Sequence, residues 1–299
     1  GDSRLALEAG AEMRTGREGR AEFSESLAPE SGDEKSLGSS ILFTSRPYPQ
    51  PMPFRPPKWA RKLGPEHLKF REITSWEYGY WWIEWGGDHD LVHDHELIRH
   101  QLLSIVMGVW DYIKNSGRFP EAGNYALDWV GMLPGKRAGR RIVGDHIVTQ
   151  SELVAGGPFP DAVAIGGWPL DDHTGMDFDH PDRPPFNSIK LERPYALPLR
   201  ALYSRNVPNL MMAGRNISCS HVAFTSTRVM ATCAVVGQAA GAAAAQCVAS
   251  RLTPRQLTAQ PALVTRLQQT LLRDDQTIPG LKNDDPNDLA RRASVNASG

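Results

Sequence analysis

The pattern of apolar and polar positions is most informative over residues 207–248. A short apolar run at residues 210–213 ends at Gly214 and predicts a buried strand. After a polar loop, small and apolar residues predict one long helix from about Ser226 to Ala249. Hydroxyl side chains at residues 225–227 can cap its start. This stretch therefore predicts a strand, a loop and a helix in an α/β core.

A second long helix is predicted over residues 94–115. Apolar residues recur there at helical spacing from Leu97 to Ile113. Asp94 can cap its start, and the Asn-Ser-Gly run at residues 115–117 predicts its end. The regular spacing indicates an amphipathic helix with one buried face.

Shorter elements surround these two helices. Strands are predicted at residues 40–44, 142–143, 147–148 and 162–165, a strand and turn over residues 195–203, and short helices from Pro254 and over residues 262–272. Six prolines between residues 47 and 57 exclude a regular helix there. Residues 283–299 are polar and read as a tail.

Arg228 falls in the first turn of the helix predicted from Ser226. A cation is unfavourable at that end, where free backbone N–H groups and the helix dipole are already positive. The sequence therefore predicts an anion or a polarised ring that faces Arg228 and the N–H groups near Val229. Gly237 and Gly241 lie on one face of this helix and allow close approach of another backbone. A plain buried helix is the alternative reading.

The composition bounds the class of protein. The chain has 299 residues, 40% of them apolar and 22% charged, and a formal net charge of −1. This is typical of a soluble protein with one or two cored domains and gives no reason to expect nucleic acid. No apolar run reaches the ~20 residues that a membrane span needs. Three cysteines, each fourteen residues apart, match no metal or disulfide pattern.

Histidines and acidic residues cluster twice. His89, His93 and His95 lie among aspartates at residues 88–95, a mixture that could bind zinc or iron. The polar start of the helix over residues 94–115 explains them without a metal, and we predict none. His173 follows two aspartates, which suits either proton transfer or a hydrogen-bonded turn.

Two further stretches combine basic or aromatic residues. Lys136, Arg137, Arg140 and Arg141 follow the Pro134–Gly135 turn, as an anion clamp or as a solvated turn. Residues 76–85 hold six aromatics, which favour a core or interface role over a surface that stacks on sugars or other rings.

The region from Asn209 to Ala244 resembles the C-terminal flavin-binding signature of the FAD-dependent oxidoreductases with a glutathione-reductase-like fold, distant relatives of the heterodisulfide reductase flavoprotein subunit. The matching elements are N-L, A-G-R-N-I-S, S-H, R-V-M, G-Q-A and the small residues after them. Relatives also carry segments like W-W-x-x-W-G-G, P-x-R-x-x-R-R-I-x-G and G-G-W-P-x-D-x-H. This chain has them near residues 81–87, 134–144 and 166–173, although in the second of them Lys136 stands before Arg137.

The first residues resemble the family's T-G-D element, in which Asp2 would lie near the flavin. In the family a dinucleotide-binding βαβ unit with the pattern G-x-G-x-x-G precedes this element, and no stretch of this chain fits that pattern. We therefore expect a C-terminal part of a longer protein that needs a missing N-terminal half to bind FAD tightly, and that could be inactive alone.

The resemblance implies an α/β fold in which a partial FAD/NAD(P)-binding domain is joined to an α+β substrate-covering domain. Residues 1–20 and 196–250 would form the FAD-binding parts, residues 21–195 the substrate-covering domain, and residues 251–299 C-terminal helices and a tail. The implied reaction is hydride transfer between a small-molecule substrate and flavin N5.

The resemblance also implies roles for individual residues. His221 or His173 would transfer a proton, and Arg137 and Arg141 would contact anionic groups. The residues implied to bind FAD are Asp2, Gly214, Arg215, Asn216, Arg228, Val229, Gly237 and Gln238. Two alternatives stay open: a metal-dependent hydrolase using the His89, His93 and His95 region, and a non-catalytic module with an aromatic binding surface.

Overall fold

The computed structural model describes residues 3–296 as two compact units. Unit 1 comprises residues 3–33, 140–170 and 189–296, and unit 2 comprises residues 34–139 and 171–188. The mixture of helices and strands fits an α/β protein. Asp2 lies outside the described residues.

Unit 1 contains most of the helices. They are α1 (Arg4–Glu8), α2 (Arg20–Phe23), α4 (Gln150–Ala155), α5 (His221–Thr227), α6 (Met230–Ser250), α7 (Pro254–Thr258) and α8 (Pro261–Arg273). Its strands are β1 (Met13–Arg14), β7 (Arg141–Ile142), β8 (Ala162–Gly166) and β11 (Tyr195–Pro198). Strand β1 pairs with β7 and β8 pairs with β11, both antiparallel.

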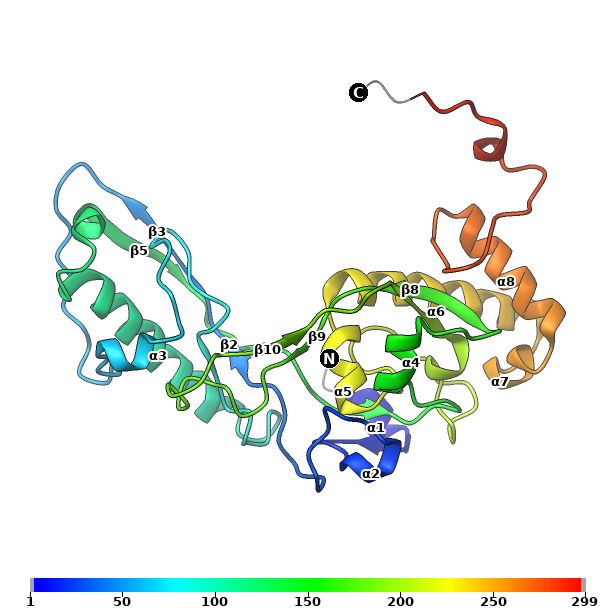
Figure 1. The fold of residues 1–299 in the computed structure, drawn as a ribbon, viewed down its shortest axis with the longest axis horizontal. Coiled ribbons are helices and arrows are strands. Elements are labelled where there is room, and N and C mark those ends of the chain that lie inside the picture. The colour runs from blue at the N-terminus through cyan, green and yellow to red at the C-terminus, as the bar shows by residue number, and fades with distance from the viewer. Residues whose placement is uncertain (1–2, 297–299) are drawn as a thin grey trace. The chain divides into compact units, whose positions relative to one another are not determined.

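Helix α6 lies against β8 and α8 (Figure 1). The contact face of α6 consists of small buried residues such as Ala239 and Ala243, which allow the helix close to the strand. Two glutamines after α6 complete β8: the Gln268 amide donates to the Pro160 and Ala162 carbonyls, and the Gln276 amide donates to the Val163 carbonyl. These side chains satisfy backbone acceptors in and just before β8.

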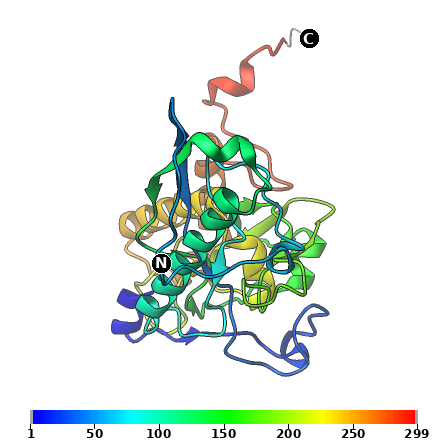
Figure 2. The same ribbon diagram turned by 90° about the vertical axis from the view of Figure 1, so that its left-hand side faces the viewer.

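Unit 2 is built around one long helix. Its elements are α3 (His95–Asn115), β2 (Ser39–Ser40), β3 (Phe43–Pro47), β4 (Glu84–Trp85), β5 (Tyr125–Val130) and β6 (Gly135–Lys136). Helix α3 lies beside the β3–β5 ladder (Figure 2), and the rings of Trp110 and Phe43 meet with centroids 5.6 Å apart. Strand β2 pairs with β4 on one side and β6 on the other.

Two strands lie where the chain passes between the units. Strand β9 (Leu170–Asp172) and strand β10 (Asn187–Ile189) are hydrogen-bonded neighbours. Unit 1 ends at Leu170 on one side and resumes at Ile189 on the other. We call this pair the β9–β10 ribbon.

Several predicted elements are confirmed and two strands are not: residues 147–148 form only an isolated bridge, between Val148 and Cys219. Helix α3 follows its predicted bounds, and Gly117 after it has the left-handed backbone (φ 75°) that favours glycine. The run at residues 210–213 forms no named strand, because its only ladder contact is an isolated bridge between Met211 and Tyr203.

Candidate functional site

The helix region after residue 220 differs from the single helix that the sequence predicts. Helix α5 begins after Ser220, whose Oγ accepts a hydrogen bond from the Ala223 N–H at 3.1 Å. The hydroxyl of Ser226, expected at a helix start, instead lies inside α5. The chain is then extended at Val229 (φ −72°, ψ 151°) before α6 begins. One helix from about Ser226 is therefore a wrong prediction, because an earlier serine caps a separate short helix.

The start of α6 is positively charged and solvent-exposed. No side chain caps it, its first turn has no acidic residue, and Met230 is 89% exposed. Arg215 and Arg228 both act electrostatically on the Cys233 thiol in this turn, opposing the burial that raises its pKa. Two guanidinium groups therefore act on the first turn of α6, which also carries the first N–H groups of the helix. This donor set fits a negatively charged or polarised end of a flavin ring.

One face of α6 is uncovered. A Cβ added at Gly237 or Gly241 would meet no atom within 4 Å, and Val248 is 81% exposed. Gln238, implied to bind the cofactor, donates from its amide to the Asp274 carbonyl at 2.9 Å. The face that carries the two glycines therefore has room for another part of a protein or for a ligand.

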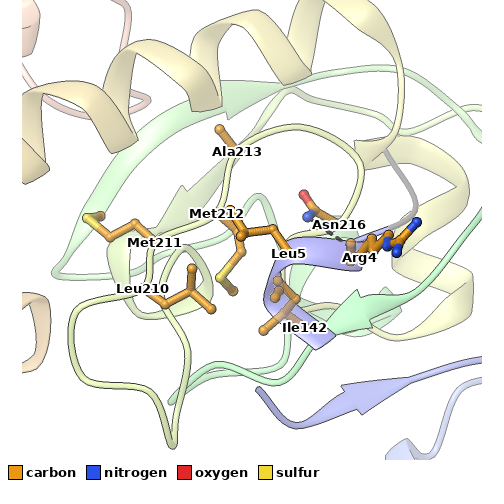
Figure 3. Close-up of a pocket in the computed structure, with 10 residues that line it drawn as sticks. Arg4, Leu5, Ile142, Leu210, Met211, Met212, Ala213 and Asn216 are labelled. Atoms are coloured by element: carbon orange, nitrogen blue, oxygen red, sulfur yellow. Dashed lines mark hydrogen bonds between the residues drawn. The ribbon is translucent and has the colours of Figure 1, made fainter. Parts of the chain in front are cut away.

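A pocket of about 540 Å³ opens next to the loop that carries Gly214, Arg215 and Asn216 (Figure 3). Its lining consists of Ser3, Arg4, Leu5, Ala6, Ile142, Leu210, Met211, Met212, Ala213 and Asn216. The Asn216 amide donates to the Ser3 hydroxyl at 3.0 Å, and Gly214 has the left-handed backbone (φ 93°) that favours glycine. The structure thus brings the first described residues to the loop implied to bind FAD.

Arg141 lies in a buried ion pair at the start of α5. Its Nη2 donates to Glu18 Oε1 at 2.8 Å, and both side chains are less than 5% exposed. Glu18 Oε2 accepts the His221 N–H at 2.7 Å. Burial alone would raise the pKa of Glu18, but the Arg141 guanidinium and the His221 N–H outweigh it and lower the pKa. A contact of Arg141 with substrate stays a prediction.

Glu25 is a second buried carboxyl beside α5. It accepts hydrogen bonds from the Ser220 hydroxyl at 2.5 Å and from the Gln150 N–H at 2.7 Å. Burial raises the pKa of Glu25, and these hydrogen bonds offset the rise only in part. Glu18 and Glu25 therefore join the N-terminal segment to the starts of α4 and α5. His221 is 2% exposed, so its role in proton transfer stays a prediction.

Arg137 and His173 come together in unit 2. Arg137 Nη1 is 3.2 Å from Glu84 Oε2, and its Nη2 donates to the Trp81 carbonyl at 2.7 Å. His173 Nδ1 is 2.8 Å from the same Glu84 oxygen, and His173 Nε2 is 3.1 Å from Asp171 Oδ2. Arg141 and His221 lie in unit 1 instead. The structure thus divides the four predicted catalytic residues into two pairs, one in each unit.

Sequence reasoning missed Glu84 and Glu18 as partners of these side chains. Glu84 is the only charged residue between Trp81 and Trp85, and a carboxylate inside an aromatic strand requires a buried partner. A buried carboxylate at this position predicts a partner but does not identify it, since Arg137 and His173 are far away in sequence.

The histidine-rich stretch at residues 88–95 forms separate pairs. His93 Nδ1 is 2.7 Å from Asp90, and His89 Nδ1 is 3.4 Å from Asp94. Within residues 3–296 no group of three or more histidines, cysteines or acidic residues could hold a metal ion. The hydrolase alternative therefore has no set of ligands in this part of the chain.

The aromatic run at residues 76–85 is mostly core. Tyr80 and Trp82 are buried and stack with centroids 4.6 Å apart, whereas Tyr78 and Trp81 are exposed. The rings of Trp81 and Phe186 pack edge to face with centroids 5.1 Å apart. The run thus serves the core of unit 2 and leaves a small aromatic surface.

Helix α6 is long and apolar enough to cross a membrane by length and composition. Only 33% of its most apolar window is buried, and a core helix of a soluble protein passes the same test. The expectation that no apolar run approaches the length of a membrane span is therefore wrong for α6. Its small residues give its most apolar window a mean hydropathy of 1.3.

Comparisons with known proteins identify a family for the chain. A protein-family model described as FAD dependent oxidoreductase matches residues 1–271. Searches of curated proteins and of solved structures gave no significant match. The match covers the start of α6, the pocket and the buried pairs described above, and the family it represents depends on FAD.

Proposed function

The chain belongs to the FAD dependent oxidoreductase family, and on that premise we propose that it transfers a hydride between a small-molecule substrate and flavin N5. The bound flavin would supply the two-electron redox chemistry. The residues of this chain would bind and orient the flavin and the substrate and exclude water from them.

The start of α6 carries this proposal. It combines an uncapped helix start with the guanidinium groups of Arg215 and Arg228. Negative charge that develops on a reduced ring is stabilised by such donors, because they are already in place when the charge appears. We propose that these two arginines and the N–H groups near Val229 bind the pyrimidine end of the flavin. Gly214 and Asn216 would contact it from the preceding loop.

We further propose that a separate N-terminal half binds the rest of FAD. No G-x-G-x-x-G pattern occurs in the 299 residues, so the usual backbone cradle for the pyrophosphate is missing from them. The uncovered face of α6 at Gly237 and Gly241, together with Leu5, which is 75% exposed, supports docking of a βαβ unit against unit 1. Small residues on that face allow another backbone to approach.

The proposal predicts weak FAD binding by residues 1–299 alone. The chain should purify colourless and bind added FAD weakly in a fluorescence titration, because the pyrophosphate donors are supplied elsewhere. Co-expression with the upstream half of its own gene should give a yellow protein with one FAD. Gly237→Trp should block this docking and leave the helix intact, because the ring would occupy the uncovered face of α6.

Two results would contradict it. The proposal of a separate half fails if the chain alone retains one FAD through gel filtration. The proposal of flavin chemistry fails if the complete protein binds FAD but none of its flavin is reduced by dithionite or by any substrate screened.

A further inference from the structure

His173 joins two carboxylates inside unit 2. Its ring nitrogens lie 2.8 Å from Glu84 and 3.1 Å from Asp171. The side chains of His173 and Glu84 are 4% and 2% exposed, whereas that of Asp171 is 17% exposed. The imidazole therefore connects a fully buried carboxylate with one that solvent reaches.

This geometry requires both ring nitrogens to donate. A neutral imidazole has one N–H and one lone pair, so one of its two contacts would place a lone pair against a carboxylate oxygen. An imidazolium donates at both nitrogens and also balances two carboxylates against two cations, since Arg137 Nη1 lies 3.2 Å from Glu84. Burial alone would lower the pKa of His173, but the hydrogen bonds to Asp171 and Glu84 outweigh burial and raise it.

The surroundings of the ring contain few other groups. The charged groups that act on it are Asp171 from β9, Glu84 from β4 and Arg137 after β6, the last of which opposes its protonation. The other neighbours are aromatic. The Trp81 ring packs edge to face against the imidazole with centroids 5.5 Å apart, and the Phe186 centroid lies 6.2 Å from that of the imidazole. The charge of the ring therefore depends on these three side chains.

The contacts link two separate parts of unit 2. Asp171 belongs to the β9–β10 ribbon, whose strands are labelled in Figure 1. Glu84 belongs to β4, in the sheet with the order β4-β2-β6. The ribbon lies where the chain leaves unit 1 after Leu170 and returns to it at Ile189. The His173–Glu84 contact thus ties the residues next to these crossings to the sheet of unit 2, in addition to the backbone bond from the Phe178 N–H to the Glu84 carbonyl farther along the segment.

We propose that His173 is a proton-controlled clasp that fixes the β9–β10 ribbon to the β4-β2-β6 sheet. Loss of one ring proton breaks one of the two contacts. The contact with Glu84 is the one released, because Glu84 keeps Arg137 as a partner, whereas the ring keeps an N–H toward Asp171, two residues away on the same segment. The ribbon is then freer at two of the places where the chain passes between the units.

Amide hydrogen exchange of the complete protein, measured between pH 6 and pH 9 and corrected for intrinsic rates, tests the clasp. Protection of residues 170–173 and 187–189 should fall by about tenfold as the pH rises through the pKa of His173. In His173→Gln the protection should be low at every pH. His93→Gln is the matched control, since that histidine is 75% exposed and paired only with Asp90, and it should follow the wild type.

Nitrogen spectra of histidine-labelled protein report the ring itself, with His173→Gln used to assign its signals. Both ring nitrogens should be protonated at pH 6.5. A neutral ring at that pH, or a ring that titrates without any change in ribbon protection, would overturn the proposal. Glu84→Gln serves if His173→Gln does not fold: it removes one charged acceptor, so the loss of protection should move to lower pH.

Discussion

At the scale of single residues, two neighbouring glutamates show how burial and partners set charge. Glu18 and Glu25 are 6% and 2% exposed, but only Glu18 has a guanidinium as a direct partner. The pKa of Glu18 is lowered and that of Glu25 is raised. The two carboxyls therefore respond to pH in opposite ways, although both join the N-terminal segment to α5.

Glu25→Gln should stabilise the protein at high pH. Because the folded-state pKa of Glu25 is raised, its favourable contribution is present at low pH and is lost as pH rises through that pKa. Glutamine keeps an acceptor oxygen without the buried charge. The free energy of unfolding in urea should rise by on the order of 1 kcal/mol at pH 8 and change less at pH 4. Glu30→Gln, at a side chain 86% exposed, should change neither value.

Arg141→Met should destabilise the protein by about 3 kcal/mol, because it leaves buried Glu18 with only the longer contact to Arg14, at 3.3 Å, as a guanidinium partner. Adding Glu18→Gln to this variant should recover part of the loss. Urea unfolding of the two single variants and the double variant at pH 7 measures the coupling. If the loss in the double variant equals the sum of the two single losses to within about 0.5 kcal/mol, Arg141 and Glu18 do not act as a unit.

At the scale of elements, the break between α5 and α6 produces the most unusual local environment. It gives α6 a start of its own, whose first turn contains no acidic residue, and Arg228 caps the end of α5 just before it. A cation suits the end of α5 and adds to the positive dipole at the start of α6. We therefore expect a ligand that is more negative in one of its states to bind there.

Arg228→Ala in the complete protein should lower the flavin midpoint potential by tens of millivolts. The lost guanidinium stabilises the reduced ring more than the oxidised ring, and ~30 mV corresponds to ~1.4 kcal/mol for two electrons. A redox titration with an indicator dye measures the shift. Arg266→Ala, on the exposed side of α8, is the control. A potential that rises or stays constant would place the flavin elsewhere.

Local signals predicted some elements well and others poorly. Helix α3 was predictable because its apolar positions repeat over 21 residues, and α7 because Thr253 and Pro254 form a cap and a first position. The start of α5 was not, since the cap at Ser220 lies inside a stretch that reads as loop. Short strands such as β1 and β4 have two residues each, too few for a period to appear.

At the scale of the whole molecule, each unit is assembled from separate stretches of chain. Unit 1 draws on three stretches and unit 2 on two. The sequence could therefore indicate Arg137, Arg141, His173 and His221 one by one from local patterns. It could not indicate that Glu84 contacts two of them, Arg137 and His173, because the pairing with His173 joins residues 89 apart in sequence. Long-range pairing of buried charges is decided by the fold.

The hydrogen bond from the Gln276 amide to β8 has a consequence for synthesis of the chain. Gln276 and the carbonyl of Val163 are 113 residues apart. At about 5–20 residues per second, a ribosome would need roughly 6–23 s to add the glutamine after the strand has been made. During that interval the strand presents open acceptors to any other nascent chain. The newly made protein is thus most prone to misassociate before its C-terminal helices emerge, and a chaperone that binds extended apolar segments would protect it then.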